Sequence, residues 1–104
     1  MTRMHWLAIF TDDPERRELR PQLLNAHLEY LRAHVETIRL AGAIRHDPNS
    51  PWEGAVWIVA ADNRNEVARL CEEDPFFIQG LRSGYQVFQW GRAPHFGAIG
   101  TVSL

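Results

Sequence analysis

His27 is the residue of this sequence whose type and position are best suited to chemistry. On the helix expected here it lies about 60° around the axis from Leu24, near Arg20 and Ile38, at the edge of an apolar stripe. We therefore expect a half-covered imidazole. Held on a rigid helix, such a group can act as a general acid or base near neutral pH. The plainer alternative is a histidine at the edge of the core whose ring is satisfied by a backbone carbonyl.

Asp74 is the second residue of interest, because it directly precedes Pro75. An aspartate in this position is typically a helix N-cap, which accepts hydrogen bonds from backbone N–H groups two and three residues later. A carboxylate has about four acceptor sites, so capping leaves it able to orient another polar group. We expect Asp74 to cap a short helix, and the cap alone assigns it no chemical role.

Three further side chains are candidates for contact with a substrate. Arg20 shares the helix face of His27 and can hold a carboxylate through two parallel hydrogen bonds, although a solvated or ion-paired arginine is the commoner case. Tyr30 flanks the same face and can line a pocket or the edge of the core. Phe76, two residues after Asp74, is either a substrate contact or a core aromatic.

No metal centre is expected. His34 follows His27 by seven residues, whereas two metal ligands on one helix need a spacing of four. The other histidines are scattered over an expected strand, a loop and the C-terminal tail: His5, His46 and His95. The single Cys71 lies on the apolar side of an expected helix, which favours a buried thiol over a nucleophile.

The composition bounds the class of protein. A chain of 104 residues suits one domain, and 45% apolar and 23% charged residues are ordinary for a soluble protein. The net charge of -2 argues against nucleic acid as a partner. All eleven basic residues are arginine, which excludes lysine chemistry. We expect a cytoplasmic protein, because no apolar run suits a signal peptide or a membrane span and the lone cysteine forms no internal disulfide.

The element that must position His27 is a long helix predicted over Arg20–Ala41 and ended by Gly42. Its apolar residues recur at intervals of four, three, four and three, and they form one stripe that should pack against a larger layer: Leu24, Leu28, Leu31, Val35 and Ile38. Glu15–Leu19 is expected to form a short helical lead-in, and Pro21 fits the first turn of the main helix.

Four strands and two shorter helices complete the expected chain. Apolar patterning predicts strands at Met4–Phe10, Ala43–His46, Ala55–Ala60 and Tyr85–Trp90. Asn63, with Glu66 three residues later, forms a capping box that starts a helix through Cys71. A short helical turn from Pro75 ends at Gly80. The order β-α-β-β-α-β predicts an α+β fold, with a four-stranded antiparallel sheet and two main helices on one face.

Both faces of the first and third strands are apolar, and two helices cover only one face of a sheet. Residues such as Leu7 and Val56 would leave apolar surface in water, and burying each such side chain stabilises a protein by roughly 1.5–3 kcal/mol. A second copy of the sheet is the simplest cover, so we expect a symmetric homodimer with a barrel-like interior. Residues 1–104 form one domain, with a core of about 4–90 and an apolar tail, 91–104, that we expect to fold over the partner.

Several segments, taken in order, resemble the YciI-like (YCII-related) family. They are AHLEYL around the first helix, AGAIRHDP in the second strand and its loop, and EDPFFIQGL before a last strand that ends in Trp90. The most specific is Asp74-Pro75-Phe76 followed by Gly80-Leu81. The similarity covers most of the chain, from about Met4 to Trp90. It implies the dimeric α+β barrel superfamily, whose fold is ferredoxin-like.

The resemblance also implies a site. In that family a histidine of the first helix and the aspartate of the Asp-Pro-Phe motif face one pocket, and their counterparts here are His27 and Asp74. As a pair, the carboxylate would fix the imidazole tautomer while the other ring nitrogen moves a proton. A relative in the family eliminates chloride from a hydroxyquinol, and lactone isomerases share the wider superfamily. The resemblance therefore implies isomerase, lyase or hydrolase chemistry on a small organic substrate, without a cofactor. The alternative is a non-catalytic dimer that binds a small ligand or regulates.

Overall fold

A four-stranded antiparallel sheet forms the central layer of the computed structural model, which describes residues 3–96, 98–99 and 102–103. The strands lie in the order β2-β3-β1-β4. Their bounds are Met4–Asp12 for β1, Ile38–Ile44 for β2, Gly54–Ala61 for β3 and Arg82–Trp90 for β4. A separate small hairpin follows the sheet: β5 at Ala98–Ile99 and β6 at Val102–Ser103.

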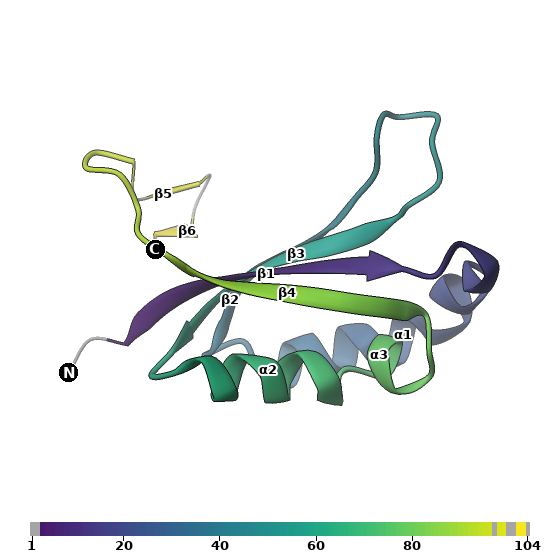
Figure 1. The fold of residues 1–104 in the computed structure, drawn as a ribbon, viewed down its shortest axis with the longest axis horizontal. Helices are drawn as coiled ribbons and strands as arrows, with labels where there is room; N and C mark the ends of the chain where they lie inside the picture. The colour runs from purple at the N-terminus through teal and green to yellow at the C-terminus, as the bar shows by residue number, and fades with distance from the viewer. Residues whose placement is uncertain (1–2, 97, 100–101, 104) are drawn as a thin grey trace.

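Three helices cover one face of the sheet, and Figure 1 shows all of them on the same side. They are α1 (Leu19–Ala33), α2 (Arg64–Glu73) and the four-residue α3 (Pro75–Ile78); a short 3₁₀ turn, η1 (Pro14–Arg16), precedes α1. This arrangement confirms the predicted α+β, ferredoxin-like fold. No helix in the described part of the chain is long and apolar enough to cross a membrane.

Alternation along the strands decides which side chains meet the helices. Trp6, Ala8 and Phe10 of β1 are buried in one apolar core together with Val67 and Cys71 of α2. This core holds the helical layer against the sheet, and it fixes the positions from which α1 and α3 present polar side chains to each other.

The opposite face of the sheet is apolar as well, as the sequence predicts. Leu7 pairs with Ile58 on one neighbouring strand and with Phe88 on the other, and Ile9 pairs with Val56. Phe88 is 46% exposed in the single chain. The expectation that the tail folds over a partner is not tested by one chain, and residues 97, 100–101 and 104 of that tail lie outside the described residues.

The main helix is shorter than its apolar periodicity predicts, and this prediction was wrong. It ends at Ala33, not Ala41, and Gly42 lies inside β2, which begins at Ile38 and not at Ala43. The reason is local and tertiary at once. The β-branched Thr37 and Ile38 disfavour helix, and pairing with β3 buries the Ile38 side chain.

The buried face of α1 also differs from the predicted stripe. Leu24, Leu28 and Val35 are 42%, 43% and 59% exposed, whereas His27 is the one buried residue of this helix, at 8% exposure. Tyr30 and Leu31 pack at the edge of the core. The helix is therefore rotated so that His27, and not Leu24 or Leu28, faces inward.

The remaining boundaries are close to those predicted. Asn63 caps α2 by accepting from the backbone N–H of Glu66, as the capping box requires. The expected lead-in helix is only η1, and β4 begins at Arg82, three residues before the predicted Tyr85. That last difference matters for the site, because it moves an arginine from an expected turn into the sheet.

Candidate functional site

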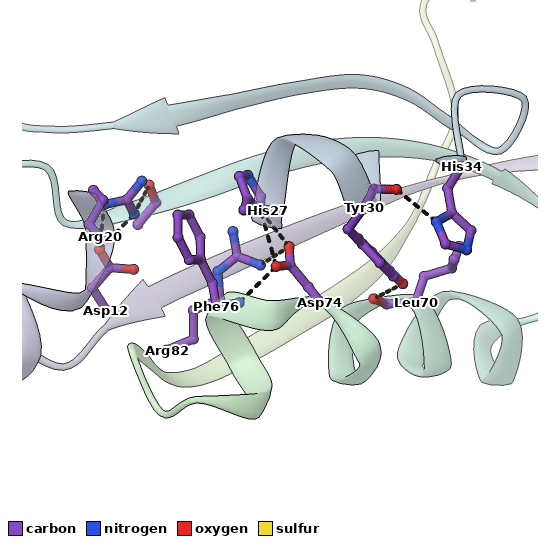
Figure 2. Close-up of polar contacts among 10 residues, drawn as sticks. Asp12, Arg20, His27, Tyr30, His34, Leu70, Asp74, Phe76 and Arg82 are labelled. Atoms are coloured by element: carbon purple, nitrogen blue, oxygen red, sulfur yellow. Dashed lines mark hydrogen bonds and ion pairs between the residues drawn. The ribbon is translucent and has the colours of Figure 1, made fainter. Parts of the chain in front are cut away.

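His27 and Asp74, 47 residues apart in sequence, meet in the interior between α1 and α3, as Figure 2 shows. Nδ1 of His27 lies 2.8 Å from Oδ2 and 3.0 Å from Oδ1 of Asp74. The Asp74 side chain is fully buried, and that of His27 is 10% exposed. An ionised carboxylate only accepts hydrogen bonds, so Nδ1 carries the proton and Nε2 is left for another partner.

Asp74 is held in place by the start of α3. Its Oδ1 accepts from the backbone N–H of Phe76 at 2.9 Å, and its carbonyl accepts from Phe77 and Ile78. The N-cap expected from the sequence therefore exists, and it serves a second purpose. A carboxylate fixed by its own helix has little freedom, so it orients the imidazole that it contacts.

Arg82 is a third member of this cluster. Its Nη1 donates to Oδ2 of Asp74 at 2.9 Å, and its side chain is fully buried. The guanidinium lies over the ring of Phe10, with 3.8 Å between its central carbon and the ring centroid. Burial lowers the pKa of Arg82, while the neighbouring Asp74 carboxylate opposes this change.

Phe76 packs its ring against one face of the His27 imidazole. The two rings are stacked, with 4.1 Å between centroids and 12° between planes. Phe76 is fully buried, and it does not line the pocket described next. The structure therefore makes it a support for His27 and does not place it where a substrate would touch it.

A pocket of about 170 Å³ opens beside His27, between α1 and strands β2 and β3. Arg20 and His27 are its titratable lining residues. The rest of the lining is apolar or small: Leu24, Leu28, Leu31, Ala41, Gly42, Ala43, Ala55 and Trp57. The exposed leucines of α1 are thus one wall of the pocket, which explains why apolar side chains face outward on this helix.

Arg20 lies in the first turn of α1 and lines the pocket, and hydrogen bonds to β1 and β3 hold its guanidinium in place. Its Nε and Nη2 donate to Oδ2 of Asp12, at 3.1 and 2.6 Å, and Nη2 also lies 3.3 Å from the carbonyl of Gly54. Its guanidinium carbon lies 5.1 Å from the centroid of Phe76. Arg20 can therefore offer an oriented positive charge to an anionic group in the pocket.

Comparison with known proteins gives the family. Residues 4–91 match the YCII-related domain. The chain belongs to this family. Among curated protein sequences, none matches this YCII-related protein significantly.

One solved structure offers a chemical comparison. The 5-chloro-2-hydroxyhydroquinone dehydrochlorinase of Burkholderia phenoliruptrix AC1100, in complex with 2,5-dihydroxybenzoquinone, is 27% identical with a TM-score of 0.80, over 88% of this chain and 98% of that one.

Two more distant structures show the fold alone. A putative antibiotic biosynthesis monooxygenase of Bacteriodes thetaiotaomicron is 15% identical, with a TM-score of 0.57, over 96% of this chain and 97% of that one. PA3566 of Pseudomonas aeruginosa is 16% identical, with a TM-score of 0.51, over 89% and 96%.

Tyr30 is a second sequence candidate, after Phe76, that lies outside this pocket. Its hydroxyl donates to the carbonyl of Leu70 on α2 at 2.7 Å, and its ring packs against His34. Burial raises the pKa of Tyr30 well above its usual value, so its hydroxyl stays protonated. Of the two positions expected for Tyr30, the structure has the edge of the core, and Tyr30 is not among the residues that line this pocket.

Sequence reasoning missed Arg82, and it placed Trp57 in the core without its contact with the pocket. Trp57 is fully buried at the pocket wall, and its Nε1 has no hydrogen-bond partner among the described residues. Arg82 had one usable signal: it follows Gly80, the glycine of positive φ that turns the chain from α3 into β4, by only two residues. Within the described residues, no group of three or more His, Cys, Asp or Glu side chains is arranged to hold a metal ion.

Proposed function

We propose that this YCII-related protein is a small enzyme that uses His27 and Asp74 for proton transfer on a small organic substrate. The observation that carries the proposal is a buried imidazole–carboxylate pair, 2.8 Å apart, at the wall of a mostly apolar pocket. A 27% identical dehydrochlorinase of the same fold supports chemistry on a small molecule. The reaction is of the isomerase, lyase or hydrolase type, and side chains alone can carry it.

The pair acts through the ring nitrogen that Asp74 does not contact. Nε2 takes a proton from an acidic C–H group, and the electron pair of the broken bond forms a C=C bond. Asp74 remains ionised and stabilises the imidazolium through Nδ1. In an elimination, a leaving group such as chloride departs from the adjacent carbon with its bonding electrons. In an isomerisation, the π electrons of an adjacent carbonyl or C=C bond shift to make room for the new C=C bond, and the proton returns to a different carbon. In a hydrolysis, Nε2 takes the proton from water, whose oxygen attacks the substrate carbonyl and displaces the leaving oxygen, which receives the proton.

The pocket favours a small anionic molecule. Its volume of about 170 Å³ is below the roughly 300–1,000 Å³ of drug-sized sites, which suits a single ring. Arg20 would receive an anionic oxygen of the substrate, and the apolar wall from Leu24 and Leu28 would cover its ring. This arrangement would set the reacting carbon beside His27.

We propose further that the working unit is a homodimer formed through the sheet faces. The face opposite the helices carries apolar residues on neighbouring strands, among them Leu7, Ile9, Val56 and Phe88. A hollow of about 410 Å³ on this face is lined by Leu40, Ile44 and Ile58 and their neighbours. Two such faces, packed together, would remove this apolar surface from water.

The function is tested by turnover on a panel of single-ring chlorinated hydroquinones and small lactones. His27→Gln should lower the rate by about 10²- to 10⁴-fold, the usual contribution of a positioned acid or base, with unchanged circular dichroism. The matched control is His34→Gln at the C-cap of the same helix, because the His34 ring bonds the carbonyl of Tyr30 away from the pocket. Wild-type rates in His27→Gln would contradict the proposal. Tight binding of a panel member without turnover would favour the non-catalytic ligand-binding module.

A further inference from the structure

Arg82 has an environment that packing alone does not explain. Its side chain is fully buried, yet in the described part of the chain only Nη1 has a hydrogen-bond partner. Nε and Nη2 have no hydrogen-bond partner there. Three aromatic rings surround the guanidinium, with centroids 3.8 Å away for Phe10, 5.2 Å for Phe76 and 5.5 Å for Trp57.

Stability is a weak reason for such an arrangement. A buried charge loses its hydration, and buried ion pairs can often be replaced by apolar side chains of similar size without loss of stability. A long apolar side chain would also fill the space between these rings. The guanidinium charge therefore calls for another explanation, and its one hydrogen-bonded partner is the carboxylate that also contacts His27.

The charges around the imidazole balance when Arg82 is counted. Asp74 faces His27 from the start of α3, and Arg82 faces Asp74 from β4. Asp12 of β1 and Arg20 of α1 form an ion pair of their own beside Phe76. The pocket wall contributed by β2 and β3 carries no charged side chain. Two carboxylates and two guanidiniums sum to zero, so a second proton on the imidazole would leave the cluster with an unbalanced positive charge.

We propose that Arg82 is a positioning residue for the proton-transfer site: it fixes the Asp74 carboxylate against Nδ1 of His27 and balances its charge, which keeps Nε2 unprotonated. This inference rests on the proposed function, in which Nε2 is the base. Without Arg82, the full negative charge of Asp74 would act on the imidazole alone and would favour its doubly protonated form. A base that is already protonated at neutral pH cannot accept the proton of a substrate.

The test is an NMR titration of the His27 ring in the full chain, which needs no substrate. Arg82→Met removes the charge while keeping an unbranched apolar side chain between the rings. We expect the midpoint of the His27 titration to rise by about one pH unit or more. Arg82→Lys restores a positive charge and should bring the midpoint back toward the wild type. Arg32→Met is the matched control: Arg32 lies on α1 but is exposed and pairs with Glu29, so this variant should titrate as the wild type does.

A wild-type midpoint in folded Arg82→Met, or the same rise in Arg32→Met, would overturn the proposal. If Arg82→Met does not fold, Arg82→Gln takes its place, because its amide can still donate to Asp74 but carries no charge. A wild-type midpoint in folded Arg82→Gln would overturn the proposal as well. The outcome is independent of turnover. If His27→Gln turned over at the wild-type rate, the proposed enzyme function would be wrong. The His27 titration midpoints of the wild type and Arg82→Met would still test the role of Arg82.

Discussion

At the scale of single residues, the site depends on one carboxylate that has three partners. Asp74 accepts from the backbone of its own helix, from His27 and from Arg82. Each bond restrains the others, since the same two oxygens serve all three donors. Asp74 is thus an ordinary helix N-cap that also orients the imidazole of His27. One side chain can serve both purposes.

The buried thiol of Cys71 gives a pH-dependent prediction. Burial raises its pKa from 9.0 to about 12 in the folded chain, so the folded state keeps a proton that the unfolded state loses. The stabilisation is complete below pH 9 and is lost as the pH rises toward 12. At pH 10.5 the free energy of unfolding should have fallen by about 2 kcal/mol from this thiol alone.

Urea unfolding of wild type and Cys71→Ala at pH 8 and pH 10.5 measures this loss. Tyr30 and Tyr85 also have raised pKa values, but they are present in both chains and cancel in the comparison. The wild type should lose more stability than the variant over this interval. An equal loss in both would show that Cys71 does not titrate as its burial implies.

At the scale of elements, the β1–β3 pairing holds Arg20 at the pocket. Gly54 pairs with Thr11, and its carbonyl lies 3.3 Å from Nη2 of Arg20. A side chain at Gly54 would collide with the backbone carbonyl of Phe10, an atom that moves only with the sheet. This glycine is therefore required by close approach of two strands.

Gly54→Ala should lower the free energy of unfolding by about 1–3 kcal/mol, as overpacking in a core does. Gly84→Ala in β4 is the control, because nothing lies within 4 Å of the side chain it would add. That variant should change stability by less than about 0.5 kcal/mol, or raise it. Denaturant unfolding of both chains makes the comparison, and equal effects would mean that the sheet yields at Gly54.

The elements also show where sequence reasoning succeeds. The fold order, the cap at Asn63 and the cap at Asp74 are encoded by neighbouring residues, so local patterns find them. The end of α1 is encoded only in part by neighbouring residues. Helical spacing continues through Ile38, the β-branched Thr37 and Ile38 disfavour helix, and pairing of Ile38 with Val59 of β3 completes the change to a strand.

The same distinction between local patterns and tertiary packing applies to the site. The motif resemblance pointed to His27 and Asp74, which do meet, whereas Arg82 was missed because the predicted strand began at Tyr85. Tyr30 lies at the edge of the core and not in the pocket, because the helix is rotated relative to its apolar stripe, with His27 buried. Leucines that read as core instead line a pocket, and periodicity cannot separate these two uses of an apolar side chain.

At the scale of the whole molecule, one layer of helices leaves half of the sheet surface uncovered. Figure 1 shows the three helices on one side of the sheet and the long β2–β3 connection rising on the other. The proposed dimer would cover this open face and would place a helical layer, with its pocket, on each outer side. The site would then be complete within each chain, because every residue named in it belongs to one protomer.

Phe88→Glu tests this assembly. Phe88 is 46% exposed on the open face, and a charge there should abolish the dimer in analytical ultracentrifugation. Ile78→Glu is the control, since Ile78 is 62% exposed on α3, in the helical layer, and this variant should remain dimeric. A monomeric wild type at micromolar concentration, or a dimeric Phe88→Glu, would contradict dimerisation through the sheet.

The central claim is that Nε2 of His27 removes a proton from a small molecule bound between α1 and the sheet. Solvent exchange measures this step whatever follows it. In D2O, wild type and His34→Gln should incorporate deuterium at an acidic C–H position of at least one panel compound, read by mass spectrometry, and His27→Gln should do so about 10²-fold more slowly or not at all. Equal exchange by His27→Gln and wild type would contradict the claim.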